Sequence, residues 1–325
     1  MGVSRRRFVV QTGGAGVLLA GVPGFAAAAQ AASFRPIPQR HVIRVIADND
    51  YAGDPDGLVA LAHQLLAPRA RTVLVTSSAL DAGFPGPIPA GTTAAAGVDI
   101  ARKAMELLRI APVPLAAGAE KLGTLAPSEA ARAIVAEAMR EDPLPLVFTC
   151  GGPLTNLAAA LELEPRIAAR MKVIWIGGGD YPDGGWEYNL MADLPAARRV
   201  LSDAKLTLTQ VPQSTYRQMQ MSIADMTARL RPISPFTQWL YDQFTSPPDF
   251  VQLGGSWPMG DTPTVLLGSV NAESSRIETV NARAITDDGH YGAPIKGRSI
   301  DVCTQIDARL AFDDFLALLM LNAGG

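Results

Sequence analysis

The chain has 325 residues, of which 48% are hydrophobic and 18% charged, with a formal net charge of −3. This length suffices for one large domain with a sizeable core. A slightly negative charge spread along the chain argues against nucleic acid and against an anionic membrane surface as partners. With two cysteines, three histidines and no CxxC pair, a zinc site is poorly supported. Cys150 and Cys303 lie far apart, so we expect two buried thiols and no disulfide.

Residues 1–32 are typical of an export signal. Residues 4–9 (SRRRFV) carry a twin-arginine signature, a weakly apolar stretch follows, and residues 26–32 are rich in Ala, which suits signal-peptidase cleavage. We expect cleavage after twin-arginine export, leaving residues 33–325 as one periplasmic or secreted domain without stable membrane association. A membrane anchor is the alternative, disfavoured because glycines, Gln11 and Pro23 lower the hydrophobicity. Retention of the intact protein in the membrane fraction would support the anchor.

An acidic turn follows the first predicted strand. Residues 42–46 form an apolar, β-branched run, and a helical apolar pattern extends to Leu66. Between them lie four carboxylates within nine residues: Asp48, Asp50, Asp54 and Asp56. Open α/β sheets place ligand sites at the carboxyl ends of strands, and clustered carboxylates repel each other unless a hard cation such as Ca²⁺ or Mg²⁺ neutralises them. A solvated acidic turn with one Asp as helix cap is the alternative, but it explains only one or two of the four.

Strands and helices alternate through the rest of the chain. Strands are predicted over residues 72–77, 113–117, 146–149, 173–176 and 206–211, helices over 92–108, 128–140 and 312–320, a broken helix over 214–250 and a hairpin over 278–307. Residues 80–91, rich in Gly and Pro, should form a loop beside the acidic turn. This order predicts a Rossmann-like, doubly wound α/β fold: a mostly parallel sheet covered by helices on both faces, in a single domain.

Three later segments place polar groups after strands. Gly151 opens a tight turn (GGPLTN) that can bring backbone carbonyls or amides to a ligand, or that is only structural. Glu187 and Asn189 would face the same side of an extended loop and could hydrogen-bond a polyol. Trp186 beside them is either an aromatic wall or a core residue. Asp261 precedes an apolar run, where an N-cap is the alternative to a ligand role.

Two of these motifs resemble the signatures of the inosine-uridine-preferring nucleoside hydrolase family. The acidic turn, DNDYAGDPD, is similar to DxDxxxDD except for Pro55, and GPLTN at residues 152–156 matches the second signature. The resemblance implies calcium-dependent hydrolysis of the N-glycosidic bond of ribonucleosides or related N-ribosides, with Asp50 as the catalytic base that activates a metal-bound water. The calcium ligands that the resemblance implies are Asp50, Asp54 or Asp56, Asp261 and the carbonyl of Gly151.

The same resemblance assigns residues to a nucleoside substrate. Glu187 and Asn189 would bind the hydroxyl on the 5′ side of the sugar, and Asp54 and Asp180 would also contact the substrate. Many members carry a leaving-group acid, a His, where this chain has Gly260. We therefore expect the departing base to stack on an aromatic side chain (Trp186, Trp257 or Tyr241), or substrates with good leaving groups to be preferred. The leaving-group acid, the base preference and the formation of a homo-oligomer stay open.

Two other functions are open at this point. An exported nucleoside- or sugar-binding protein could keep the fold and the metal but not turnover, and Pro55 and Gly260 are the departures that favour it. Nucleoside binding without ribose release would support this alternative. A haloacid-dehalogenase-like phosphatase also begins with a strand and DxD, but it needs Thr or Val where Ala52 stands. Phosphate release from p-nitrophenyl phosphate would support the phosphatase.

Overall fold

A computed structural model of the chain describes residues 37–84, 86–247 and 254–324. The predicted export signal, residues 1–32, lies outside the described residues. The described residues from 39 onward form one compact unit. Within the described ranges, no helix combines the length and the apolar character needed to cross a bilayer. Cys150 and Cys303 are buried free thiols, as predicted.

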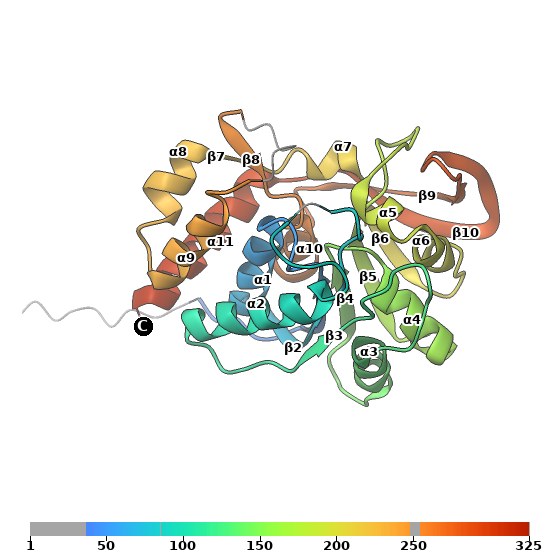
Figure 1. Ribbon diagram of the computed structural model, residues 1–325, viewed down its shortest axis with the longest axis horizontal. Coiled ribbons are helices and arrows are strands. Elements are labelled where there is room, and N and C mark those ends of the chain that lie inside the picture. Colours follow the sequence, from blue (N-terminus) through green and yellow to red (C-terminus); the bar gives the residue numbers. More distant parts are fainter. Residues whose placement is uncertain (1–36, 85, 248–253, 325) are drawn as a thin grey trace, which may run out of the picture. The chain divides into compact units, whose positions relative to one another are not determined.

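The centre of the described unit is an eight-stranded sheet in the order β3-β2-β1-β4-β5-β6-β10-β9 (Figure 1). The strands are β1 (Ile43–Asn49), β2 (Ala70–Ser77), β3 (Leu115–Ala117), β4 (Leu146–Cys150), β5 (Met171–Ile176), β6 (Thr207–Val211), β9 (Arg276–Ile285) and β10 (Tyr291–Gln305). Neighbouring strands run parallel, except that β9 returns antiparallel to β10 at the sheet edge. The predicted mostly parallel sheet is confirmed.

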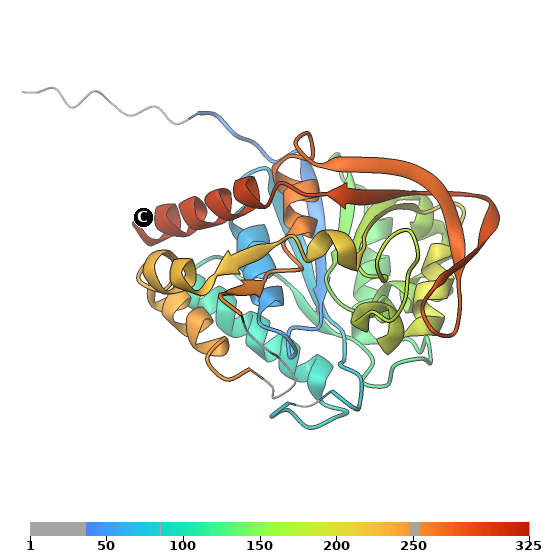
Figure 2. The same cartoon turned by 90° about the horizontal axis from the view of Figure 1, so that it is seen from above.

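Helices cover both faces of this sheet (Figures 1 and 2). One face carries α1 (Asp56–Leu66), α2 (Thr93–Leu108), α9 (Pro235–Gln243) and α11 (Ala308–Gly324), and the other carries α3 (Glu129–Met139), α4 (Thr155–Leu163) and α6 (Leu194–Leu201). Successive side chains of β1 enter opposite cores, since Val45 packs in the first and Ile46 in the second. A strand buried on both faces explains the continuous apolar run in the sequence. The doubly wound arrangement is confirmed.

The segment after β6 differs from the predicted broken helix. It contains α7 (Gln213–Tyr216), α8 (Ile223–Asp225), a π-helical turn (Met226–Leu230) and α9, but also a short strand, β7 (Gln220–Ser222). This strand pairs antiparallel with β8 (Ser256–Pro258), with Met221 opposite Trp257. Both of these side chains are buried, so pairing the two strands removes more apolar surface from water than exposing Met221 on a helix would. Residues 248–250 of the predicted helix lie outside the described residues.

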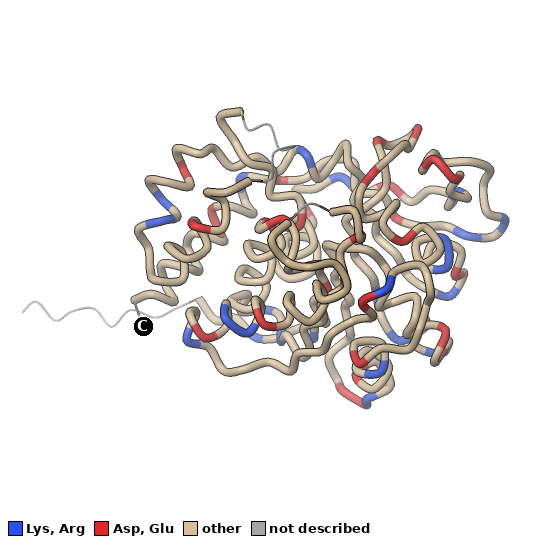
Figure 3. The backbone as a smooth tube through the Cα atoms, in the orientation of Figure 1, with Lys and Arg blue, Asp and Glu red and all other residues tan. Residues whose placement is uncertain are grey.

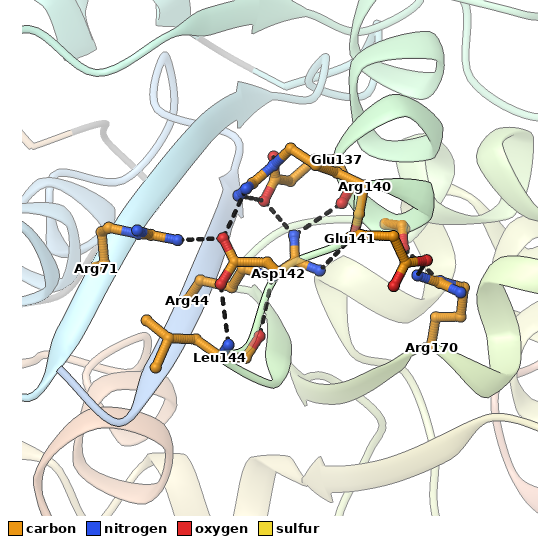
Figure 4. Close-up of polar contacts among 9 residues, drawn as sticks. Arg44, Arg71, Glu137, Arg140, Glu141, Asp142, Leu144 and Arg170 are labelled. Carbon is orange, nitrogen blue, oxygen red and sulfur yellow. Dashed lines mark hydrogen bonds and ion pairs between the residues drawn. The ribbon is translucent and has the colours of Figure 1, made fainter.

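Ion pairs hold the sheet at the amino ends of β1 and β4 (Figure 4). The buried guanidinium of Arg44 donates to the carbonyl oxygens of Leu144 (3.1 Å) and Glu137 (2.8 Å) and pairs with the Glu137 carboxylate. Arg140 pairs with both Glu137 (2.7 Å) and Asp142 (2.6 Å). Elsewhere, acidic and basic residues are interspersed along the chain (Figure 3). The network thus anchors the beginning of β1, whose other end carries the acidic turn.

Candidate active site

The acidic turn and the GGPLTN turn meet at the carboxyl edge of the sheet. The parallel register places Asp48 of β1 beside Cys150 of β4, and Cys150 beside Trp175 of β5. The backbone N–H of Gly151 donates to the carbonyl oxygen of Asp48 (3.0 Å), which joins the two turns directly. Ligand sites of open α/β sheets form at such an edge. Topology thus brings together two motifs that lie about a hundred residues apart.

Asp261 lies against the acidic turn although 205 positions separate it from Asp56. Its backbone N–H donates to Oδ2 of Asp56 (3.2 Å), and its own Oδ2 accepts a hydrogen bond from Nδ2 of Asn49 (2.9 Å). The helix that follows, α10 (Pro263–Val265), begins after Thr262 and has no side-chain cap. The carboxylate of Asp261 therefore faces the turn and does not serve as an N-cap.

The buried carboxylates of this cluster raise one another's pKa. Burial raises the pKa of Asp50 to about 7, and the charges of Asp54, Asp48 and Glu187 add to the effect. Burial also raises the pKa of Asp56 and of Asp261 well above the ordinary value. The second-largest cause is a neighbouring charge: the charge of Asp261 raises the pKa of Asp56, and the charge of Asp50 raises the pKa of Asp261. The charged groups that act on these acids are other carboxylates. A cation would relieve both the burial and the repulsion.

Asp54 and Asp56 occupy different environments. Asp56 is buried in the first turn of α1 and faces Asp261, whereas Asp54 is exposed. Oδ1 of Asp54 accepts a hydrogen bond from the indole Nε1 of Trp257 (3.3 Å). The ring of Trp257 is only 2% exposed and packs edge-on against Phe244, with 5.0 Å between ring centroids. Trp257 thus touches the acidic turn through its N–H, but as a core residue and not as an open stacking surface.

Glu187 and Asn189 stand at the start of a short helix and not in the predicted extended loop. Glu187 is the N-cap of α5 (Tyr188–Ala192), because its carboxylate accepts the backbone N–H groups of Asn189 (3.2 Å) and Leu190 (2.9 Å). Nδ2 of Asn189 donates to the carbonyl oxygens of Gly151 (2.8 Å) and Ile176 (3.0 Å). These side chains therefore connect α5 with the ends of β4 and β5, beside the carboxylate cluster.

The other predicted substrate residues make no hydrogen bond with the carboxylate cluster among the residues that the structure describes. Asp180 and Trp186 belong to the loop between β5 and α5, where both are exposed, Trp186 by 65%. The turn between β9 and β10 holds this loop, since Gly185 N–H donates to Gly289 (3.1 Å). In the described part of the chain, no hydrogen bond joins Asp180 or Trp186 to the carboxylate cluster. Tyr241, on α9, shares a hydrogen bond with Thr227 (3.0 Å).

Three side chains of the site were not predicted. Asn49 accepts the N–H of Asp50 (2.8 Å) while it donates to Asp261, and its position between two Asp residues at a strand end was the available signal. The hydroxyl of Tyr188 accepts the N–H of Asp81 (3.2 Å), and its ring contacts Phe84, which ties the predicted 80–91 loop to the site. Tyr216 donates to Glu187 (3.2 Å), and nothing local in the sequence marks it.

Comparisons with known proteins identify the family. A family model described as inosine-uridine preferring nucleoside hydrolase matches residues 45–313. The chain belongs to this family. A curated relative, the inosine-uridine preferring nucleoside hydrolase of Crithidia fasciculata, is 30% identical over 130 residues, 30% of this chain and 41% of that protein. The pyrimidine-specific ribonucleoside hydrolase RihA of Salmonella arizonae is 29% identical over 119 residues, 34% of this chain and 38% of that protein.

Solved structures show that the fold extends over the whole nucleoside hydrolase domain. The inosine-uridine preferring nucleoside hydrolase of Bacillus anthracis superposes with a TM-score of 0.65 at 20% identity, covering 86% of this chain and 99% of that one. The purine-preferring ribonucleoside hydrolase of Gardnerella vaginalis gives 0.64 at 17% identity, with the same coverage. The sequence matches, by contrast, span about two fifths of the curated relatives. The family assignment argues against the phosphatase alternative.

Proposed function

We propose that this nucleoside hydrolase family member hydrolyses the N-glycosidic bond of ribonucleosides or related N-ribosides to ribose and free base. The observation that carries the proposal is the contact of Asp261 with Asp56 and Asn49, at 3.2 and 2.9 Å, beside Asp50. Family membership supports it, as do the names of the Crithidia and Salmonella relatives. We further propose export by residues 1–32, to be checked by the amino-terminal sequence of the mature protein.

Calcium is the cofactor that suits the chemistry of this site. Carboxylate and carbonyl oxygens are its preferred ligands, and the donors would be Asp50, Asp56 or Asp54, Asp261 and the carbonyl of Gly151. When bound, calcium supplies the charge that neutralises the clustered acids and oxygen coordination for a ribose diol. As they stand, His, Cys, Asp and Glu residues in the described ranges form no ready-made group of three that could hold a metal ion. We therefore expect binding to reorient these carboxylates.

The roles proposed for the protein groups follow from their positions. Asp50, at the carboxyl end of β1 beside Asp54 and Asp48, would accept the proton of the water that attacks the anomeric carbon. The neighbouring carboxylates would stabilise the positive charge that develops on the sugar ring as the bond breaks. The side chain of Asp48 accepts hydrogen bonds from Thr76 (2.5 Å) and Asn156 (2.7 Å), which holds the strand end that presents Asp50.

A reducing-sugar assay over a panel of purine and pyrimidine nucleosides tests the proposal. We expect ribose release that a calcium chelator abolishes and added calcium restores. Asp50→Asn should lower kcat by about 10²- to 10⁴-fold, the usual contribution of a general base. Asp99→Asn, on an exposed position of α2, removes a charge away from the site and serves as the control. A folded protein that releases ribose from none of the nucleosides would contradict the proposal.

A nucleoside-binding protein without turnover is the second candidate. It is favoured by Gly260, which leaves no side chain to protonate the departing base at the position next to Asp261. Calorimetric binding of a nucleoside without ribose release would establish this second candidate.

A further inference from the structure

The carboxylate of Glu187 is fully hydrogen-bonded in this structure. Oε2 accepts the backbone N–H groups of Gly178 (2.8 Å) and Leu190 (2.9 Å). Oε1 accepts the N–H of Asn189 (3.2 Å) and the hydroxyl of Tyr216 (3.2 Å). A carboxylate offers about four lone-pair positions, so these four donors fill them. A ligand hydroxyl can bind Glu187 only when one of the donors leaves.

Tyr216 is the donor that can leave. The N–H groups of Asn189 and Leu190 belong to the first turn of α5, and that of Gly178 to the backbone after β5, so none can turn away without rearranging the main chain. Tyr216 is a half-buried side chain at the end of α7, and rotation about its side-chain bonds is enough to move its hydroxyl. A ligand is therefore expected to displace the phenol first.

The ring of Tyr216 lies between Glu187 and the carboxylate cluster. A Cβ added at Gly260 would lie 3.0 Å from Cδ2 of Tyr216 and 3.4 Å from Oδ2 of Asp56. The tyrosine ring thus lies over the backbone next to Asp261, while its hydroxyl reaches Glu187. A ligand that spans the distance from the cluster to Glu187 must contact this ring. Because Gly260 has no side chain, the ring of Tyr216 can pass close to its backbone.

We infer that the Tyr216 hydroxyl occupies the place of a ligand hydroxyl on Glu187, and that a ribose-like polyol binds by exchanging with it. The inference rests on the proposed function for its choice of sugar. It makes Tyr216 a specificity residue, because a ligand must supply a hydroxyl donor of its own to offset the hydrogen bond that Tyr216 gives up. A sugar that lacks this hydroxyl would leave Glu187 bonded to the phenol.

The test is Tyr216→Phe, which keeps the ring and removes only the competing hydroxyl. D-ribose and 5-deoxy-D-ribose are the probes, with their affinities measured by calorimetry and KM and kcat measured for inosine and uridine. We expect D-ribose binding to tighten by about 3- to 10-fold, the effect of one hydrogen bond, with KM falling in parallel and kcat within about twofold. Binding of 5-deoxy-D-ribose should not tighten.

Tyr181→Phe serves as the matched control, because Tyr181 lies in the exposed loop after β5 and its hydroxyl makes no hydrogen bond in the described structure. If Tyr216→Phe fails to fold, Tyr216→Leu removes the same hydroxyl. Unchanged or weaker D-ribose binding in the folded variant would overturn the inference, since a purely structural tyrosine predicts that result. If D-ribose binding tightens but no nucleoside is hydrolysed, the inference stands and the proposed function fails.

Discussion

Pro55 separates two acids that the family motif places next to each other. It occupies the N-cap position of α1 with φ −67° and ψ −6°, which a proline ring accommodates without strain. The extra residue moves the second acid, Asp56, into the first turn of the helix, where it is buried and faces Asp261. Asp54 is exposed, and its carboxylate accepts a hydrogen bond from the indole N–H of Trp257. Of the two, Asp56 is the better placed to take part in cation binding.

This difference predicts unequal effects of two conservative substitutions. Asp56→Asn should weaken calcium binding by about tenfold or more, because it removes a charge from among the buried oxygen donors. Asp54→Asn should weaken binding by less than about threefold, because Asp54 bonds the indole N–H of Trp257, whereas Asp56 is the acid that contacts Asp261. Titration calorimetry with calcium chloride measures both, with Asp99→Asn as the control. A larger loss in Asp54→Asn would assign the ligand to Asp54 instead.

At the scale of elements, side-chain hydrogen bonds attach the turn between β4 and α4 to neighbouring elements. Oγ1 of Thr155 donates to Asp193 (2.6 Å), ahead of α6, and Nδ2 of Asn156 donates to Asp48 of β1 (2.7 Å). The Thr and Asn of GPLTN therefore fix the turn to its neighbours. Gly151 comes before them, where a Cβ would lie 2.4 Å from Nδ2 of Asn49 and 2.6 Å from Cγ of Asp261. Glycine is required there by the close approach of both Asn49 and Asp261.

Gly151→Ala should therefore displace Asp261 while the sheet stays intact. We expect kcat/KM to fall by about a hundredfold, which is the order of loss for a reacting group misplaced by about 1 Å. Gly255→Ala is the control, because a Cβ at Gly255 meets no heavy atom of the described residues within 4 Å. Steady-state kinetics give the result, and circular dichroism verifies folding. Unchanged kcat/KM in a folded Gly151→Ala variant would mean that the position of Asp261 is not important for turnover.

For the whole molecule, the carboxylate cluster makes stability depend on pH. The pKa values of Asp48 and Asp50 are raised to about 7 from 3.8, chiefly by burial, so between these values the folded state binds more protons than the unfolded state. Stability must then fall as pH rises through this window, because ionising the buried acids is unfavourable. A bound cation would reverse that penalty.

Calorimetry of the whole protein tests this linkage. Without divalent cations, the contribution of these acids to stability should be greatest near about pH 4 and lost by about pH 7 to 8. Calcium at about 100 times the Kd measured at about pH 8 should add about 2.7 kcal/mol at that pH and raise Tm. The same calcium concentration should add less at about pH 5, where protonated acids bind the cation more weakly. A Tm gain from calcium that is larger at pH 5 would contradict the assignment of these acids to the site. Magnesium provides the comparison for ion selectivity.

The predicted strands β1, β2, β4 and β5 are found close to their expected positions, because each is a short apolar run ended by turn residues. Ser128 caps α3 as predicted, through a hydrogen bond from the N–H of Ala131 (3.1 Å). The pair β7–β8 was not predicted. Each strand has three residues, and the central partners, Met221 and Trp257, lie 36 positions apart, too far for a local pattern to reveal. Pairing of this kind is decided by which side chains are buried.

The alternation of strands and helices up to β6, the doubly wound fold and the two signature turns were determined by the sequence alone, because hydrophobic periodicity and turn chemistry act over a few residues. Only the tertiary structure decided that Asp56 and not Asp54 faces Asp261, that Trp257 is a core residue and that Tyr216 bonds Glu187. Such contacts depend on how sheet and helices pack over long separations, and packing involves all the side chains at once.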